Sequence, residues 1–183
     1  MQRRLVIVAL AAAVGLASGC GDDGDDSSAP AFGASERLTL SSTAFADGGM
    51  IPRRHTCDGE NISPPLSFSK VPSGTKSLAV LVEDPDAPRG PFTHWVVYDA
   101  DPSQTRWPAG QVPRDAAQGR NGFTKNGYSG PCPPQGKPHH YVFSGYAVDR
   151  ALRLPSDASA DDLKQTLKGH ALAYGSLTGR YGR

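Results

Sequence analysis

The sequence of 183 residues has little net charge and only one long apolar run, at its N-terminus. Beyond that run, no segment is apolar for long enough to span a bilayer as a helix, and no segment repeats. Lysine and arginine total 19 against 18 aspartate and glutamate, a net charge of +1. Proteins that bind nucleic acid through its phosphates carry a marked basic excess, so this composition excludes a nucleic-acid partner of that kind.

Two common catalytic motifs are also missing. The sequence has no H-E-x-x-H, which sets two zinc ligands on one helix face, and no G-x-S-x-G, which exposes a nucleophilic serine on a tight turn. Helix-borne zinc sites and α/β-hydrolase chemistry are therefore disfavoured. Other metal-dependent or nucleophilic hydrolysis stays open at this point.

The N-terminus predicts export. Arg3 and Arg4 precede an apolar run at 5–16, which is too short for a mature transmembrane helix and typical of a signal peptide. Small residues then lead to Cys20, in a pattern that resembles the bacterial lipobox, where the cysteine is diacylated and becomes the first mature residue. An ordinary secretory signal that happens to contain a cysteine is the alternative.

We therefore expect residues 1–19 to be a signal peptide and 20–35 to be the lipidated cysteine with a flexible linker rich in Asp, Gly and Ser. Residues 36–183 have the length of one domain. This arrangement places the domain on the extracytoplasmic side of a bacterial cell envelope. Its contact with the membrane would be made only through the lipid.

The three cysteines bear on the same expectation. If Cys20 carries lipid, Cys57 and Cys132 remain, and an even pair in an oxidising compartment predicts one disulfide. Two unpaired, buried thiols are the alternative. The bond would join the loop around Cys57 to the proline-rich loop around Cys132 and make this proline-rich loop more rigid.

The composition predicts a mainly β domain. Sixteen prolines and 21 glycines argue for many turns and against a helical protein. Short runs rich in Val, Tyr and Phe lie between turn residues, as strands do. The expected strands lie at 38–40, 66–68, 77–83, 94–98, 141–149 and 175–181. Short strands with long loops predict a sandwich or a small barrel.

One helix is expected near the C-terminus. Ser159 can cap it, and the two aspartates that follow suit a first turn of partial positive charge. Apolar positions then recur at three- and four-residue steps, which predicts one buried stripe. The stripe consists of Leu163, Leu167, His170, Ala171 and Tyr174. His170 is interpreted as a core or capping histidine, not as a ligand.

Two rigid, proline-rich loops each lead to a histidine beside a strand. The first is Asp84-Pro85-Asp86-Ala87-Pro88, whose last peptide bond is a candidate for the cis form. By alternation, His139 and Tyr141 face one way and His140 faces the other. We expect the loops to form the walls of one polar pocket. Its predicted members are Asp84, Asp86, His94, His139 and Tyr141.

Several chemistries fit that set. Histidine, tyrosine and backbone N–H groups can donate to phosphate oxygens, while Asp84 orients a histidine or accepts from a ligand. Two histidines with one or two aspartates are also enough for zinc. Nucleophilic hydrolysis would need a hydroxyl from Ser129, Ser144 or Thr93. Finally, the same residues could simply pin loops by buried hydrogen bonds.

The segments Asp84-Pro85-Asp86-Ala87-Pro88 with Phe92-Thr93-His94-Trp95, and Gly130-Pro131-Cys132-Pro133-Pro134 with His139-His140-Tyr141, resemble the phosphatidylethanolamine-binding protein (PEBP) family. The greatest likeness is to its bacterial YbhB/YbcL branch, the Raf kinase inhibitor-like proteins. The resemblance extends from about residue 38 to residue 181.

This resemblance implies a β-sandwich of two antiparallel sheets with flanking short helices and a C-terminal helix. It also implies a pocket for a small anion or a phosphorylated head group, with no cofactor and no catalysis. The Cys57–Cys132 pair fits exported members. The implied ligand-binding residues are Asp84, Asp86, Pro88, His94, Gly130, Cys132, Pro133, His139 and Tyr141.

Relatives that inhibit kinases or serine proteases supply an alternative, a protein-interaction module with a protease or kinase-like partner. A metal-dependent hydrolase is a second alternative.

Overall fold

The computed structural model describes residues 32–183. The expected signal peptide, Cys20 and most of the linker lie outside the described residues. Among the helices that the structure does describe, none is long and apolar enough to cross a membrane.

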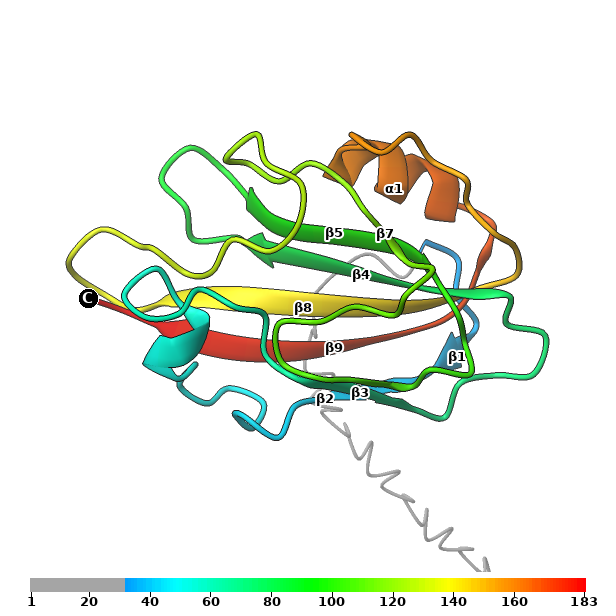
Figure 1. Ribbon diagram of the computed structural model, residues 1–183, viewed down its shortest axis with the longest axis horizontal. Coiled ribbons are helices and arrows are strands. Elements are labelled where there is room, and N and C mark those ends of the chain that lie inside the picture. Colours follow the sequence, from blue (N-terminus) through cyan, green and yellow to red (C-terminus); the bar gives the residue numbers. More distant parts are fainter. Residues whose placement is uncertain (1–31) are drawn as a thin grey trace, which may run out of the picture.

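A six-stranded sheet forms the centre of the domain (Figure 1). Its strands are ordered β1-β9-β8-β4-β5-β7, and every neighbouring pair is antiparallel except β1 and β9, which are parallel. The strands are β1 (Glu36–Arg37), β4 (Ser77–Asp84), β5 (Phe92–Ala100), β7 (Ala117–Gln118), β8 (His139–Val148) and β9 (Ala171–Tyr181).

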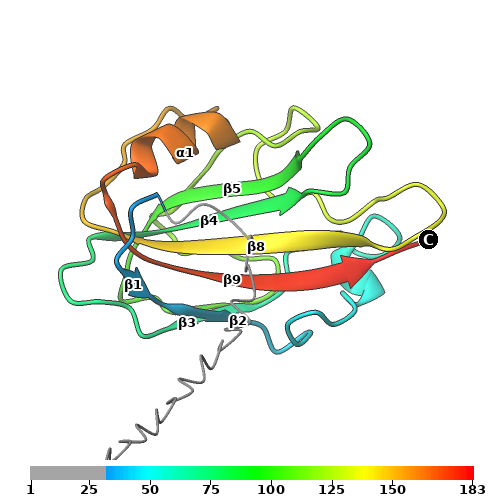
Figure 2. The same cartoon turned by 180° about the vertical axis from the view of Figure 1, so that it is seen from behind.

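A three-stranded sheet covers one face of the large sheet, and a single helix covers the other. The small sheet is ordered β2-β3-β6 and is antiparallel throughout. Figures 1 and 2 show α1 on the opposite side of the molecule from β2 and β3. The elements are β2 (Thr39–Ser41), β3 (Leu66–Ser69), β6 (Arg106–Trp107), α1 (Ala160–Leu167) and the short 3-10 helix η1 (Arg53–His55).

Both faces of the central strands are therefore buried. Along β4, Val80 and Val82 pack against the small sheet, while Ala79 and Leu81 pack on the side of α1. A strand covered on both faces has a continuous apolar run rather than an alternating one. The expected mainly β sandwich of two sheets with a C-terminal helix is confirmed.

The expected strands are present, with ends shifted by a few residues. The strand expected at 94–98 begins at Phe92 and ends at Ala100, and the one at 141–149 is β8. Three two-residue strands, β1, β6 and β7, were not expected. The prediction of a cis bond between Ala87 and Pro88 is wrong, because no peptide bond of the described residues is cis.

The helix begins as predicted and ends too early. The Ser159 hydroxyl accepts from the backbone N–H of Asp162, whose carboxylate accepts from the N–H of Ser159, a complete capping box. After Leu167 the chain turns at Gly169, which has a φ of +76°. His170 therefore lies outside the helix, where its Nδ1 is 3.2 Å from Asp149 Oδ1.

The last two members of the predicted stripe are buried, but on strand β9. Ala171 and Tyr174 are both in its first half. The three- and four-residue spacing was correct about the burial of these two residues and wrong about the type of element. The interpretation of His170 as a core histidine is also wrong, because 29% of its side chain is exposed.

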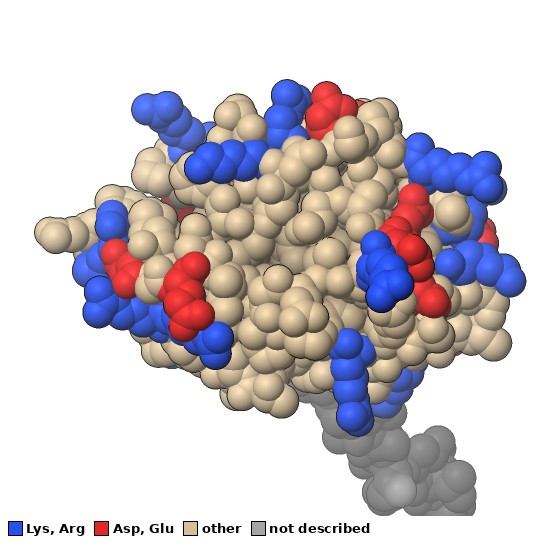
Figure 3. All heavy atoms as spheres, viewed as in Figure 1, with Lys and Arg blue, Asp and Glu red and all other residues tan. Residues whose placement is uncertain are grey.

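Charges of both signs are interspersed on the surface. Figure 3 shows lysine and arginine next to aspartate and glutamate around the edge of one face, with uncharged residues in its middle. Neither sign forms a large continuous patch on this face.

Candidate functional site: a pocket with a polar floor and an apolar rim

A pocket of about 180 Å³ opens where β4 ends and β5 and β8 begin. It lies on the face of the large sheet that also carries the small sheet. Its floor is polar and its rim is apolar. The lining residues are Asp84, Ala87, Pro88, Phe92, His94, Phe123, Cys132, Pro133, Pro134, His139 and Tyr141.

Asp84 orients one histidine of the floor. It is the last residue of β4 and is 4% exposed. Its Oδ2 accepts from Nδ1 of His139 at 2.8 Å, and its Oδ1 accepts from the backbone N–H of Asp86 at 2.9 Å. Because Nδ1 donates, Nε2 is the ring atom of His139 that is left for another partner.

His94 is held in a similar way. Its Nδ1 donates to the backbone carbonyl of Ser129 at 2.6 Å. Burial lowers the pKa of His94, and the opposing effects of the Ser129 carbonyl and the Asp84 charge do not cancel it. At neutral pH the ring is therefore uncharged, and its Nε2 is an acceptor.

The hydroxyl of Tyr141 is the one buried side-chain polar atom of the described residues that has no hydrogen-bond partner. Burial, then the nearby Asp84 charge and a weak polar contact with the Asp84 carboxylate that is not a geometric hydrogen bond, raise the pKa of Tyr141. The hydroxyl therefore keeps its proton and is a donor. The ring meets that of His94 edge to face, with centroids 5.2 Å apart. A buried donor without a partner costs about 1–3 kcal/mol, so its presence in a pocket points to an external partner.

A β-bulge brings His94 into the pocket. Along the β4–β5 pair, Val82 is opposite Trp95, but Glu83 is opposite Thr93. His94 is the extra residue, so Trp95 can face the core between the sheets while His94 faces the same side. Strict alternation would have separated these two neighbours, and a bulge re-aims a side chain in this way.

The apolar rim includes residues that sequence analysis did not place in the site, namely Ala87, Phe92, Phe123 and Pro134. Phe123 is 43% exposed, and its ring meets that of Phe92 edge to face at 4.8 Å. Gly122 permits this packing, because a Cβ there would be 2.6 Å from the Phe92 ring. Phe123 belongs to an irregular loop, so no periodic signal in the sequence could have located it.

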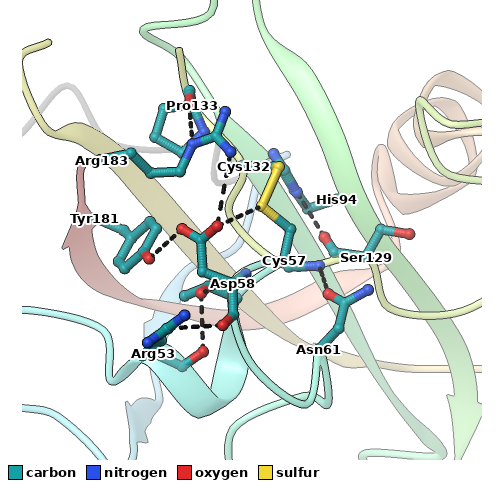
Figure 4. The surroundings of a disulfide bond; sticks show 12 residues. Arg53, Cys57, Asp58, Asn61, His94, Ser129, Cys132, Pro133, Tyr181 and Arg183 are labelled. Atoms are coloured by element: carbon teal, nitrogen blue, oxygen red, sulfur yellow. Dashed lines mark hydrogen bonds and ion pairs between the residues drawn. A yellow bond between two sulfur atoms is a disulfide. The ribbon is translucent and has the colours of Figure 1, made fainter. Parts of the chain in front are cut away.

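One wall of the pocket is held by the disulfide. Cys57 and Cys132 are bonded, with Cα atoms 5.4 Å apart, so the predicted pair is confirmed (Figure 4). The next residue, Pro133, accepts at its carbonyl from Nε of Arg183 at 2.8 Å. An Arg183 nitrogen is in turn 3.7 Å from Asp58. The loop is thereby tied both to the segment after η1 and to the C-terminus.

Seven of the nine predicted residues line the pocket, and Asp86 and Gly130 do not. Asp86 lies in the turn after β4, where alternation no longer applies. Its Oδ2 accepts from the backbone N–H and the Nδ1 of His140, both at 2.7 Å. Burial opposes its charged form, but these bonds outweigh that effect and lower the pKa of Asp86. As predicted, His140 faces away from the pocket.

Gly130 has a structural role instead. Its N–H donates to Oδ1 of Asn61 at 2.7 Å, so it is not free to donate to a ligand. A Cβ at this position would be 2.4 Å from the carbonyl oxygen of His55. Glycine is needed here because two loops pass at contact distance.

The serine and threonine hydroxyls considered for hydrolysis do not line the pocket. The described residues contain no group of three or more His, Cys, Asp and Glu side chains that could hold a metal ion. Ser144 lies on β8 next to Phe143, a pocket-side core residue, and so faces the other side of the sheet. The Ser129 hydroxyl accepts from Asn121, and Thr93 lines a separate groove beside α1.

A β-sandwich with a small pocket at one end of its main sheet defines a binding module for small molecules or proteins. Residues 41–182 match the family described as phosphatidylethanolamine-binding protein, and the chain belongs to this family. Its members are in general binding proteins rather than enzymes.

Several relatives cover the domain. A UPF0098 protein of Methanothermobacter thermautotrophicus is 46% identical over 151 residues, which is 80% of this chain and 99% of the relative. Another from Pyrococcus horikoshii is 38% identical over 192 residues, covering 100% of this chain and 91% of the relative.

Two solved structures share the fold. A PEBP homologue of Chlamydia trachomatis has a TM-score of 0.77 at 39% identity, covering 81% of this chain and 99% of its own. Escherichia coli YbcL, a member of the same family, has a TM-score of 0.76 at 34% identity, covering 80% of this chain and 99% of YbcL. The similarity to YbcL agrees with the bacterial branch that the sequence motifs indicate.

Proposed function

We propose that the protein binds a small phosphorylated anion, phosphate or a phosphoethanolamine-like head group, in this pocket and does not turn it over. The observation that supports this most directly is the buried, unpartnered hydroxyl of Tyr141 in the floor. A ligand oxygen would give that donor the partner it lacks. The family name, which describes members that bind phosphatidylethanolamine, agrees with this ligand class.

The charge of the floor restricts which anion fits. None of the described residues that line the pocket is lysine or arginine. The floor has the Asp84 carboxylate and Nε2 of His94 as acceptors, and one hydroxyl donor. A fully deprotonated phosphate would meet too many acceptors.

An anion therefore needs additional hydrogen-bond donors in order to bind here. Protonation of His94 or His139, a protonated phosphate, or the ammonium group of an ethanolamine head group can each supply them. Phosphoethanolamine offers both an acceptor and an ammonium donor. The aromatic and proline rim then contacts its CH₂ groups.

We also propose that the domain is exported and tethered through a lipid on Cys20. The disulfide supports an oxidising, extracytoplasmic location, because such bonds persist there. A tether close to a membrane would keep the pocket near phospholipid head groups.

Calorimetric titration with phosphate and with phosphoethanolamine tests the proposal. The wild type should bind saturably, and the Asp84→Ala, His94→Ala double variant should not bind. Tyr141→Phe, which removes only the unpartnered hydroxyl, should weaken binding about tenfold, as expected for a hydrogen bond to a charged group. Tyr98→Phe is the control, because its hydroxyl donates to the Pro155 carbonyl, far from the pocket lining.

Failure of the wild type to bind either ligand would overturn the proposal. Equal binding by the wild type and the double variant, whose fold is checked by circular dichroism, would also overturn it. In either case protein partners such as proteases become the next class to examine, with the surface loops as the contact region.

A further inference from the structure

We propose a second binding site, for a neutral sugar, in a polar cavity that is separate from the pocket. The cavity has a volume of about 250 Å³. It shares none of its lining residues with the pocket. Its polar and aromatic lining residues are Asn61, Ser63, Trp95, Gln111, Gln118 and Tyr128.

The chemistry of the cavity suits an uncharged ligand. None of its described lining residues carries a charge, whereas three of them carry a carboxamide and one carries an aliphatic hydroxyl. An ion bound here would have no side chain of opposite charge to pair with. A ligand with several hydroxyl groups can both accept from and donate to such side chains.

Two of the carboxamides are already oriented. Oδ1 of Asn61 accepts from the N–H of Gly130, and Oε1 of Gln118 accepts from the indole N–H of Trp95, both at 2.7 Å. Because each oxygen is engaged, the amino group of each amide remains to donate. Donors fixed before binding lose little conformational entropy when a ligand arrives.

Ser63 offers a hydroxyl to the cavity. The residue is only 3% exposed, and its side chain forms no hydrogen bond with any described residue. Because Tyr141 holds the one fully buried side-chain polar atom without a partner among the described residues, the hydroxyl of Ser63 keeps some accessible surface. Since Ser63 lines the cavity, a ligand hydroxyl there can bond to it.

An aromatic wall completes the site. The hydroxyl of Tyr128 donates to the carbonyl of His55 at 2.8 Å, which fixes the ring. The ring meets that of Trp95 edge to face at 5.5 Å. Amides beside an aromatic surface match a sugar, which has hydroxyl groups at its edge and C–H groups on its faces.

The size agrees with a single sugar ring. A cavity of 250 Å³ has room for about eight water molecules at their liquid volume and is smaller than pockets for drug-sized ligands.

Titration followed by ¹H–¹⁵N NMR tests this site directly, with glucose, galactose and N-acetylglucosamine as probes. We expect at least one sugar to cause saturable shifts of the indole N–H of Trp95 and the side-chain amides of Asn61 and Gln118. Ser63→Ala and Gln111→Ala should each weaken that binding about fivefold, the loss expected for one hydrogen bond. Ser73→Ala, at an exposed turn between β3 and β4, is the matched control and should change nothing.

The proposal is wrong if none of the three sugars shifts these signals saturably, or if Ser63→Ala binds as tightly as the wild type. It is equally wrong if phosphate alone produces the same shifts. The test of the sugar site is independent of the test of the pocket. Tyr141→Phe should weaken phosphoethanolamine binding and leave the sugar titration unchanged.

Discussion

The floor of the pocket and its disulfide-bonded wall are held in place by different kinds of interaction. The floor consists of side chains on paired strands, with Asp84, His94 and Tyr141 all buried. The wall, Cys132–Pro134, is irregular loop without strand pairing. One disulfide and one hydrogen bond from Arg183 connect it to other segments.

This difference separates two properties of the site. Under the proposed function, the floor sets which ligand binds, and its geometry is kept as long as the sheet is folded. The shape of the opening resides in the wall and depends on a few contacts. Variants of the wall should therefore change stability and access together, while conservative variants of the floor should change binding chemistry.

The largest expected effect is on the wall. Replacing Cys57 and Cys132 with alanine should lower the free energy of unfolding by about 4 kcal/mol, because the bond closes a loop of 75 residues. Urea unfolding with and without a reductant measures this. The double variant itself should not respond to the reductant, and equal midpoints for oxidised and reduced wild type would contradict the prediction.

On the floor, two isosteric changes form a matched pair. Asp84→Asn should lower the free energy of unfolding by about 2 kcal/mol, because it weakens a buried bond to a histidine. Asp86→Asn should cost less than about 1 kcal/mol, since Asp86 pairs with His140 near the surface. Chemical denaturation compares them, and equal losses would show that burial of the floor does not strengthen its bonds.

Burial of the floor should also make the stability of the protein depend on pH. Burial lowers the pKa of His94 from 6.5, so the unfolded chain takes up a proton at a higher pH than the folded one. Stability should therefore fall as the pH drops below 6.5, until the lower folded-state pKa is reached. An anion that binds protonated His94 should bind more tightly in the same window and recover that stability.

Thermal unfolding between about pH 5 and 8, with and without sulfate, measures both effects. Sulfate is suitable because its charge is constant over this range. In His94→Gln the corresponding part of the pH dependence should disappear. An unchanged profile in that variant would assign the effect to another group.

The smallest expected effect is a gain. Tyr141→Phe removes a buried hydroxyl that has no partner, so the free protein should become more stable by up to about 1 kcal/mol. Tyr98→Phe should instead lose about 1 kcal/mol, because its hydroxyl is bonded. Both are measured by urea unfolding without ligand, and a clear loss in Tyr141→Phe would mean that its hydroxyl already has a partner.

The features that could be predicted from the sequence are mostly those controlled by interactions between residues close in the chain. Alternation placed His139 and Tyr141 on the pocket side of β8 and His140 on the other side. The cap at Ser159 needs only residues within one helical turn. The cysteine pair followed from a count and from an expected compartment.

Features that depend on contacts between two distant segments could not be predicted from the sequence. The helical spacing through Tyr174 also fits burial along β9, and the positive φ at Gly169 decides between them. Asp86 and Gly130 have the residue types of a ligand site, but His140 and Asn61 use their bonding groups. Nothing in the neighbouring sequence reveals those partners.

The sequence by itself determined the class of fold, the pairing of cysteines and most residues of the pocket, because periodicity and short-range bonds act within a few residues. Only the tertiary structure decided how His94 enters the floor and that Phe123 reaches the rim. A bulge is a property of the register between two strands, and the position of a loop aromatic depends on the surface on which it packs.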